Sequence, residues 1–242
     1  MAPRLVLVII IVAFVAGLAV ASFAEFREFI PGLLQGALVT LEITAAGAAL
    51  ALVCAVVAAL AKLYAPAPFN WLAVAYIELF RGTSALVQLF WMFFVLPHFG
   101  ILLDPIPVAI LALGLNVGAY GAEVVRGAVL AVPRGQWEAT IALNMTRTEA
   151  LRRVILPQAF VAMIPPWGNL FIELLKSTSL VSLITITDLT FRAQQMNQTT
   201  LKTVPIFTLV LLIYLAMSLV LTIGMRFLEA RASRGLARGR AA

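Results

Sequence analysis

Residues 136–157 read QWEATIALNMTRTEALRRVILP and form a polar, charged island between long apolar runs. Apolar residues such as Ile141 and Leu143 recur within the island, as they do in short amphipathic helices. A bundle of apolar spans has no structural need for such a stretch. We therefore interpret it as a surface that docks a soluble partner, while the surrounding spans form a solute pathway. An ordinary surface loop is the alternative, although it would not need large apolar residues beside a turn.

The island is predicted to fold as a helix, a sharp turn, a second helix and a stop. Asn144 is one of the few non-glycine residues that tolerate the left-handed backbone with which helices end. Thr146 and Glu149, in TRTE, match a capping box at the start of the second helix. Pro157 disfavours helical backbone at Leu156, so we expect that helix to end there. A DNA-reading helix-turn-helix has a similar pattern, but tethering between spans at both ends argues against that function.

Composition places the chain in a membrane. The 242 residues are 63% hydrophobic and 12% charged, with a mean hydropathy of +1.05. A soluble domain carries about 25% charged residues, and several apolar runs here reach the roughly 20 residues that cross a bilayer. These features predict an all-α, polytopic bundle. The single Cys54 is interpreted as a small packing residue, and His98 has no second metal ligand in view.

Six spans are expected in one membrane domain, residues 1–242. The apolar runs lie at 5–20, 37–63, 71–96, 108–130, 159–186 and 206–227. The first is interpreted as a retained helix in preference to a signal peptide, because its apolar core is long for a signal and further spans follow. We divide the domain into an additional N-terminal span and outer connection at 1–35, a core at 36–227 that contains the loop at 133–158, and a basic tail at 228–242.

Charge placement sets the expected orientation. The net charge is +6 and the isoelectric point is near 10.1. With both termini cytoplasmic, 13 of the 17 lysines and arginines fall on the inner side or at inner helix ends. The positive-inside rule favours this arrangement, which also places residues 136–157 in the cytoplasm. It explains the basic composition without any nucleic acid as partner.

Polar residues within the spans are candidates for the pathway or for structural pairs. Two pairs three residues apart, Glu78 with Arg81 and Glu123 with Arg126, share helix faces and are predicted ion pairs. Gly82 permits a bend, either at the inner surface or beside the pathway. Glu173 and Lys176 are each other's expected partners, and ionisable groups in a span suggest function. The candidate substrate-pathway residues are Thr83, Ser84, Gln88, Asn116, Glu173, Lys176, Thr178 and Ser179; helix-to-helix hydrogen bonding is the alternative for each.

The polar island resembles the shared cytoplasmic loop of the membrane subunits of binding-protein-dependent ABC importers. That loop has the pattern EAA, three residues, G, nine residues, I-x-LP. Here Glu138, Ala139, Leu156 and Pro157 match in place, while Thr140, Val154 and Asn144 replace Ala, Ile and Gly. The resemblance implies that the loop sits in a groove on an ATPase subunit and transmits its closure to the spans. The candidate coupling residues are Gln136, Trp137, Glu138, Ala139, Asn144, Arg152, Leu156 and Pro157.

Three further stretches resemble the polar amino-acid branch of these permeases. They are ELFRGTSALVQLFW at 78–91, AYGAEVVRGAVLAVPRGQWEA at 119–139 and LLKSTSLVSLIT at 174–185. The branch often shows RGTP, where this chain has Ser84 in place of proline. The combination is most similar to permeases of ectoine/hydroxyectoine importers. Members of the family commonly have five core spans, so the run at 5–20 would be an added helix.

The resemblance implies a bacterial inner-membrane transport subunit that is not itself an enzyme. The chain lacks a GxxxxGK[ST] phosphate-binding string, so we expect ATP and Mg²⁺ on two partner ATPase subunits and no cofactor on this chain. A second permease chain, identical or related, and an extracytoplasmic solute-binding protein are the other expected partners. The rival functions are a secondary transporter or channel, which would favour inverted repeats, and a membrane enzyme, for which a nucleophilic or metal site is not evident.

Overall fold

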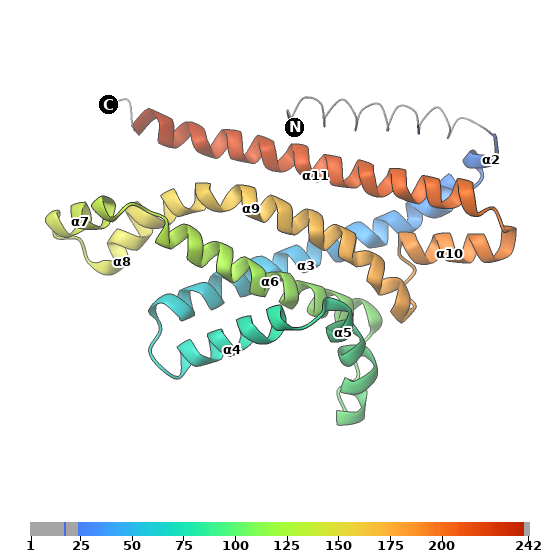
Figure 1. Ribbon diagram of the computed structural model, residues 1–242, viewed down its shortest axis with the longest axis horizontal. Helices are drawn as coiled ribbons and strands as arrows, with labels where there is room; N and C mark the ends of the chain where they lie inside the picture. The colour runs from blue at the N-terminus through green and yellow to red at the C-terminus, as the bar shows by residue number, and fades with distance from the viewer. Residues whose placement is uncertain (1–16, 18–23, 240–242) are drawn as a thin grey trace.

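The computed structural model describes residue 17 and residues 24–239, and all the secondary structure within 24–239 is helical (Figure 1). Four helices are long and apolar enough to cross a membrane, and a bent pair at 69–99 supplies a possible fifth span. The all-α membrane bundle is therefore confirmed with four or five candidate spans among the described residues. Apart from residue 17, the expected first span at 5–20 lies outside them.

The described elements are all helical, and several of them continue one another in a single helix. In chain order they are α2 (Ala24–Arg27), α3 (Ile30–Tyr64), α4 (Phe69–Gly82), α5 (Ala85–Phe90), the π-helix η1 (Trp91–Val95), the 3-10 helix η2 (Leu96–Phe99), α6 (Pro105–Leu130), α7 (Arg134–Ala142), α8 (Arg147–Ala150), the π-helix η3 (Leu151–Ile155), α9 (Leu156–Ser177), the 3-10 helix η4 (Thr178–Ile184), α10 (Leu189–Thr200) and α11 (Thr203–Gly239). Figure 1 shows α7 and α8 at one end of the bundle and α10 at the other.

Small residues bring α3 and α6 close together, as the Ala- and Gly-rich run in α3 predicts. A Cβ added at Gly114 of α6 would lie only 3.1 Å from the carbonyl oxygen of Gly47 in α3. Buried alanines extend the contact along both helices, with Ala51 and Ala112 fully buried. The pair forms the centre of the main apolar cluster, around which α4 and α9 pack.

Most of the predicted connection at 24–35 is helical, and α3 starts before the expected residue 37. α3 begins at Ile30, with proline in its first turn, where a missing amide donor costs nothing. Phe29 and Leu33 are buried in a second apolar cluster with Leu189 of α10 and Ile206 of α11. Burial of this apolar face explains why the helix extends beyond the expected start at residue 37.

A hydrogen-bonded junction joins α3 to the start of α10. The Thr40 hydroxyl donates to the Gly36 carbonyl and accepts from the Leu189 amide, both at 3.2 Å. The fully buried Asp188 carboxylate caps α10 by accepting from the Thr190 and Phe191 amides. Burial raises the pKa of this carboxyl to about 6, against the lowering effect of those amide donors. Asp188 lies between the spans, so this junction fixes one end of the bundle.

The second helix of the polar island does not stop at Leu156. α8, η3 and α9 form one continuous helix that runs from Arg147 towards Ile184. Pro157 lacks an amide donor, but it lies in the first turn of α9 and follows the π-helical turn of η3. The wider turn changes the hydrogen-bond register just before the proline, so the helix continues past it. Our prediction of a stop was wrong for this reason.

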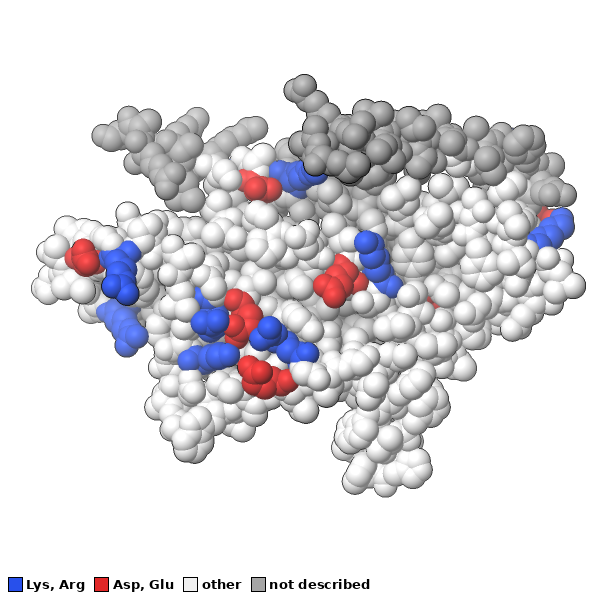
Figure 2. Space-filling model, in the orientation of Figure 1, with Lys and Arg blue, Asp and Glu red and all other residues white. Residues whose placement is uncertain are grey.

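Charged side chains on the face seen in Figure 2 gather towards the end that carries α7 and α8 and over the neighbouring parts of α4 and α6. Much of the rest of that face is uncharged. The exposed surface of the long helices is rich in large apolar side chains, such as Leu38 on α3 and Leu211 and Val220 on α11. Apolar side chains exposed along a span are what a lipid environment requires.

Candidate functional site

α7 is held against the bundle by one face. Trp137 is half-buried against the main apolar cluster, and Thr140, three residues on, is buried. The Thr140 hydroxyl donates to the Trp137 carbonyl at 2.7 Å. At the loop's base, the Gln158 side-chain amide donates to Gln136 Oε1 at 3.0 Å. Trp137 and Thr140 therefore anchor α7 to the bundle.

The exposed face of α7 is apolar at its end. Ile141 and Leu143 are 74% and 73% exposed, and Glu138 and Ala139 are exposed beside them. Large apolar side chains with this exposure are expected against lipid or against a partner. α7 lies beyond the end of α6 and of the continuous α8–α9 helix, where Figure 1 shows it at the tip of the molecule.

The turn after α7 is a Schellman motif centred on Asn144. This residue has φ 55°, as the sequence predicts for the position. The Met145 amide donates to the Thr140 carbonyl at 3.0 Å, and the Asn144 amide donates to the Ile141 carbonyl at 2.9 Å. These bonds satisfy carbonyls that a helix end otherwise leaves unpaired. The turn is thus a defined structure and not a loose loop.

The predicted capping box is confirmed at the start of α8. The Thr146 hydroxyl accepts from the Glu149 amide, and the Glu149 carboxylate accepts from the Thr146 amide at 3.0 Å. The remaining candidate coupling residues lie on the helix that follows. Arg152 and Leu156 line a pocket against α3, and Pro157 is exposed at the start of α9. Arg152, Leu156 and Pro157 therefore lie on the continuous helix, which contacts the start of α7 through Gln158 and Gln136.

The break between α4 and α5 is stabilised by polar side chains. α4 and the α5–η2 segment meet at 105°, so the last carbonyls of α4 lose their helical donors. The Phe80 carbonyl accepts from the Asn116 amide at 2.8 Å and from the Gln88 amide at 2.9 Å. Asn116 also donates to Gln88 Oε1, and Gln88 donates to the Thr83 hydroxyl. These contacts follow the rule that irregular backbone at membrane depth needs protein partners.

A pocket of about 180 Å³ opens beside this break. Thr83, Ser84 and Asn116 line it, as does Glu173 from α9. Sequence reasoning missed Ser177 and Tyr120, which also line it. Ser177 was detectable in principle, because it lies four residues after Glu173 and so shares its helix face. The pocket combines hydroxyls, an amide and one carboxylate.

Four of the candidate pathway residues do not line this pocket, namely Gln88, Lys176, Thr178 and Ser179. Thr178 is fully buried and donates to the Leu175 carbonyl at 2.7 Å. Ser179 donates to the Lys176 carbonyl at 2.9 Å. Lys176 is exposed on the described chain and does not line the pocket. The turn from α9 into η4 directs Thr178 into the core, which spacing along the sequence does not indicate.

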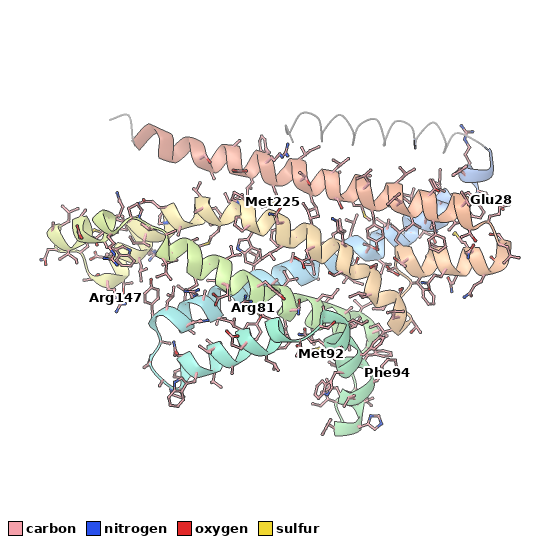
Figure 3. The ribbon with its side chains drawn as sticks, viewed as in Figure 1. Glu28, Arg81, Met92, Phe94, Arg147 and Met225 are labelled. Atoms are coloured by element: carbon pink, nitrogen blue, oxygen red, sulfur yellow. The ribbon has the colours of Figure 1, made fainter. Side chains whose placement is uncertain are left out.

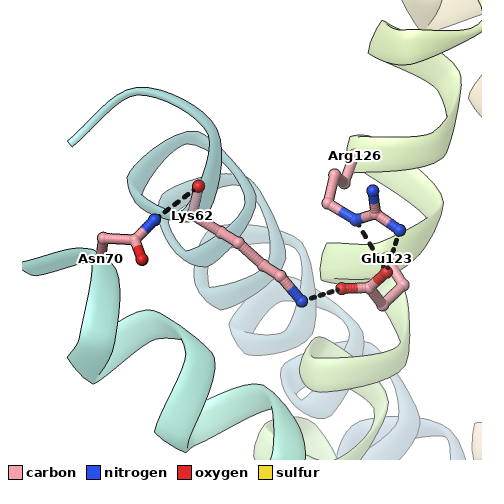
Figure 4. A network of polar contacts seen from close by, with 4 residues as sticks. All are labelled: Lys62, Asn70, Glu123 and Arg126. Carbon is pink, nitrogen blue, oxygen red and sulfur yellow. Dashed lines mark hydrogen bonds and ion pairs between the residues drawn. The ribbon is translucent and has the colours of Figure 1, made fainter.

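Glu123 is the centre of a charged network at the ends of three helices (Figure 4). Its carboxylate contacts Arg126 at 2.7 Å and Lys62 of α3 at 2.8 Å. The side-chain amide of Asn70, from α4, donates to the Lys62 carbonyl at 2.6 Å. The pairing of Glu123 with Arg126 has the predicted spacing. The contact with Lys62 was not predicted, because no local rule links positions so far apart.

The other two predicted pairs do not form ion pairs in the described residues. Glu78 and Arg81 are both exposed, as are Glu173 and Lys176, and exposed groups gain little from pairing. Instead, the Arg81 guanidinium lies 5.4 Å from the centre of the Tyr120 ring. Arg81 is about 18 Å along α4 from its first residue, in the middle of the molecule (Figure 3). Arg81 therefore lies beside Tyr120, which lines the pocket.

Comparisons with known proteins decide the family. The family described as "Binding-protein-dependent transport system inner membrane component" matches residues 47–234. The chain belongs to this family. As a permease it is 44% identical to the "Probable amino-acid ABC transporter permease protein" of Sinorhizobium fredii, over 87% of this chain and 91% of that relative. It is 38% identical to the L-cystine transport system permease of Bacillus subtilis, over 88% and 91%.

A solved structure agrees with this assignment of the permease. The crystal structure of an amino acid ABC transporter with histidines superposes with a TM-score of 0.81 and 33% identity, covering 87% of this chain and 98% of that one. Membership of an importer permease family supports the transport interpretation over a secondary transporter, a channel or a membrane enzyme. It also agrees with a multi-pass location in an inner membrane.

Proposed function

We propose that this permease imports a polar amino acid or a zwitterionic amino-acid derivative, and that α7 and α8 couple it to an ATPase dimer. The observation that carries the coupling role is the exposure of Ile141 and Leu143 at the end of a helix that Trp137 and Thr140 anchor. A rigid turn at Asn144 fixes these two side chains at the tip of the bundle. An apolar protrusion of this kind suits a groove on a folded partner.

The proposed orientation places both termini, α7 and α8 in the cytoplasm. Basic residues concentrate at that end, including Arg134, Arg147, Arg152 and Arg153, and this bias supports a cytoplasmic location. The ATPases would hold the ATP and Mg²⁺. A second permease chain and an extracytoplasmic solute-binding protein complete the proposed assembly, in which two copies or two related chains enclose the pathway.

The proposed substrate contacts lie at the pocket beside the α4–α5 break. Glu173 supplies an anion for a substrate's cationic group, and Arg81 stands next to Tyr120 at its edge. Thr83, Ser84 and Asn116 supply neutral hydrogen-bonding groups. The amino-acid relatives support this substrate class. Ectoine and hydroxyectoine remain specific candidates within it, on the resemblance of residues 78–91 and 174–185.

The coupling proposal is tested by co-purification with the cognate ATPase. We expect Ile141→Asp with Leu143→Asp to abolish co-purification and substrate-stimulated ATP hydrolysis. Leu201→Asp is the matched control, because Leu201 is 82% exposed at the end of α10, at the opposite end of the bundle. Retention of the ATPase by the double variant would refute the docking role.

The substrate proposal needs a separate measurement. Uptake into proteoliposomes that contain the complete transporter is followed with labelled polar amino acids and with ectoine as competitor. Glu173→Gln is expected to reduce uptake of a substrate with a cationic group at least tenfold, while ATPase co-purification is unchanged. Uptake that is insensitive to Glu173→Gln would place the substrate contacts elsewhere.

A further inference from the structure

A second pocket lies between the end of α3 and the α8–η3–α9 helix. Its volume is about 440 Å³. The lining residues are Leu60, Tyr64, Arg147, Thr148, Leu151, Arg152 and Leu156. None of them lines the pocket beside the α4–α5 break. Neither the proposed substrate contacts nor the exposed face of α7 accounts for it.

The pocket is cationic on one side and apolar on the other. Arg147 and Arg152 supply two guanidinium groups, and no Asp or Glu lines it. Neither arginine forms an ion pair within the part of the chain that the structure describes. The Arg147 guanidinium lies 5.1 Å from the centre of the Tyr64 ring, which orients it at the pocket wall (Figure 3). Charge complementarity therefore calls for an anionic ligand.

The position of the pocket identifies the class of anion. Tyr64 is the last residue of the candidate span α3, so the pocket lies at one end of that span. Tyrosine is enriched at the membrane interfaces where spans end, and basic pockets between membrane helices bind lipid head groups. Leu60, Leu151 and Leu156 offer an apolar wall that a soluble anion would leave exposed to water. An acyl chain would cover it.

We propose that this pocket binds an anionic phospholipid, with its phosphate between Arg147 and Arg152 and an acyl chain against Leu60, Leu151 and Leu156. The lipid would join the end of α3 to the helix that leads out of the polar loop. This inference rests on charge and position at a span end. It does not depend on the transported substrate, but it uses Arg152 and Leu156, which are also candidate coupling residues.

The test uses the full-length chain purified in a neutral detergent. Retention of dioleoylphosphatidylglycerol is measured by native mass spectrometry, and its affinity by the shift in melting temperature. Dioleoylphosphatidylcholine and inorganic phosphate are the two comparison ligands. We expect the anionic lipid alone to be retained and to raise the melting temperature. Arg147→Gln with Arg152→Gln should weaken its binding about 30-fold, since each basic residue near a membrane surface contributes roughly a factor of five.

The control variant is Arg226→Gln with Arg231→Gln. These arginines are also five residues apart, on α11, and are exposed, so the charge change is the same. Arg147→Lys with Arg152→Lys keeps the charge and should retain most of the lipid binding, which guards against a folding defect in the glutamine variant. The proposal would be overturned if the α11 control lost lipid binding equally, or if inorganic phosphate raised the melting temperature as much as the lipid. It would also be overturned if the glutamine variant lost ATPase binding while its lipid retention was unchanged.

Discussion

The Lys62 ammonium lies 2.8 Å from Oε1 of Glu123, although the two residues are 61 positions apart in the chain. The contact joins the end of α3 to α6, and Arg126 binds the second carboxylate oxygen. Two cations thus share one anion where each side chain is only partly exposed. Loss of Glu123 would therefore leave two cations without an anion. Loss of Lys62 or of Arg126 would still leave one ion pair.

Glu123→Gln is expected to destabilise the permease, because Lys62 and Arg126 would then face each other without an anion. Lys62→Met and Arg126→Met should each cost less. In a double-mutant cycle, we expect a coupling of about 1 kcal/mol between Lys62 and Glu123, in the range found for residues in one charged network. Thermal unfolding in detergent provides the measurement. Additive single-mutant effects would show that the contact contributes nothing measurable.

Gly36→Ala should destabilise the junction between α3 and α10. A Cβ at this position would lie 2.7 Å from the Asp188 carbonyl oxygen and 2.8 Å from the Leu189 Cα. Both are backbone atoms, so relief requires movement of the chain at a cost of about 1–3 kcal/mol. Gly127→Ala in α6 is the control, since no atom lies within 4 Å of its added Cβ. There, higher helix propensity should stabilise by roughly 0.5–1 kcal/mol. Equal melting temperatures for the two variants would contradict the packing argument.

Asn144→Gly should preserve or slightly raise stability, while Asn144→Val should lower it. The backbone φ of 55° costs an ordinary L-residue about 1–2 kcal/mol and glycine almost nothing. The local defect should also loosen the position of Ile141 and Leu143. Hydrogen exchange of the Met145 amide, which closes the Schellman motif, reports the change directly. Unchanged protection in Asn144→Val would show that the turn tolerates the strain.

Asp188→Asn should remove a pH dependence from stability. Burial raises the pKa of Asp188 from 3.8 to about 6 in the folded chain, so the folded state binds this proton more tightly than the unfolded state. The resulting stabilisation is complete below pH 4 and is lost as the pH rises through 6. The melting temperature of the wild type relative to Asp188→Asn should therefore fall between pH 4 and pH 7. Parallel pH profiles for the two proteins would refute the assignment.

Local patterns predicted local structure well. The capping box of Thr146 with Glu149 and the left-handed Asn144 both depend on residues within one or two turns, and both are present. Both are stabilised by contacts within the nearby sequence. The bend at Gly82 is also present, but Asn116 of α6 supplies part of its stabilisation from 36 positions away.

Features that depend on tertiary packing were not predictable in the same way. The partner of Lys62 lies on another helix, and Thr178 is buried by packing of the turn after α9. The helix was predicted to end at Leu156, but a π-helical turn before Pro157 lets it continue. No residue pattern in the sequence indicates that turn. For the candidate pocket, the sequence indicated Thr83, Ser84, Asn116 and Glu173 by type, whereas Tyr120 and Ser177 emerged only from the fold.

The uninterrupted helix from Arg147 through Ser177 has a mechanical consequence. Glu173 is 26 residues from Arg147, roughly 39 Å along one rod. A tilt of about 10° at the Arg147 end would swing Glu173 by roughly 7 Å if the rod stayed stiff. Pro165 and Pro166 interrupt the amide ladder between them and supply a point where the rod can flex. The pocket carboxylate and the polar loop thus lie on one helix, with two adjacent prolines between them.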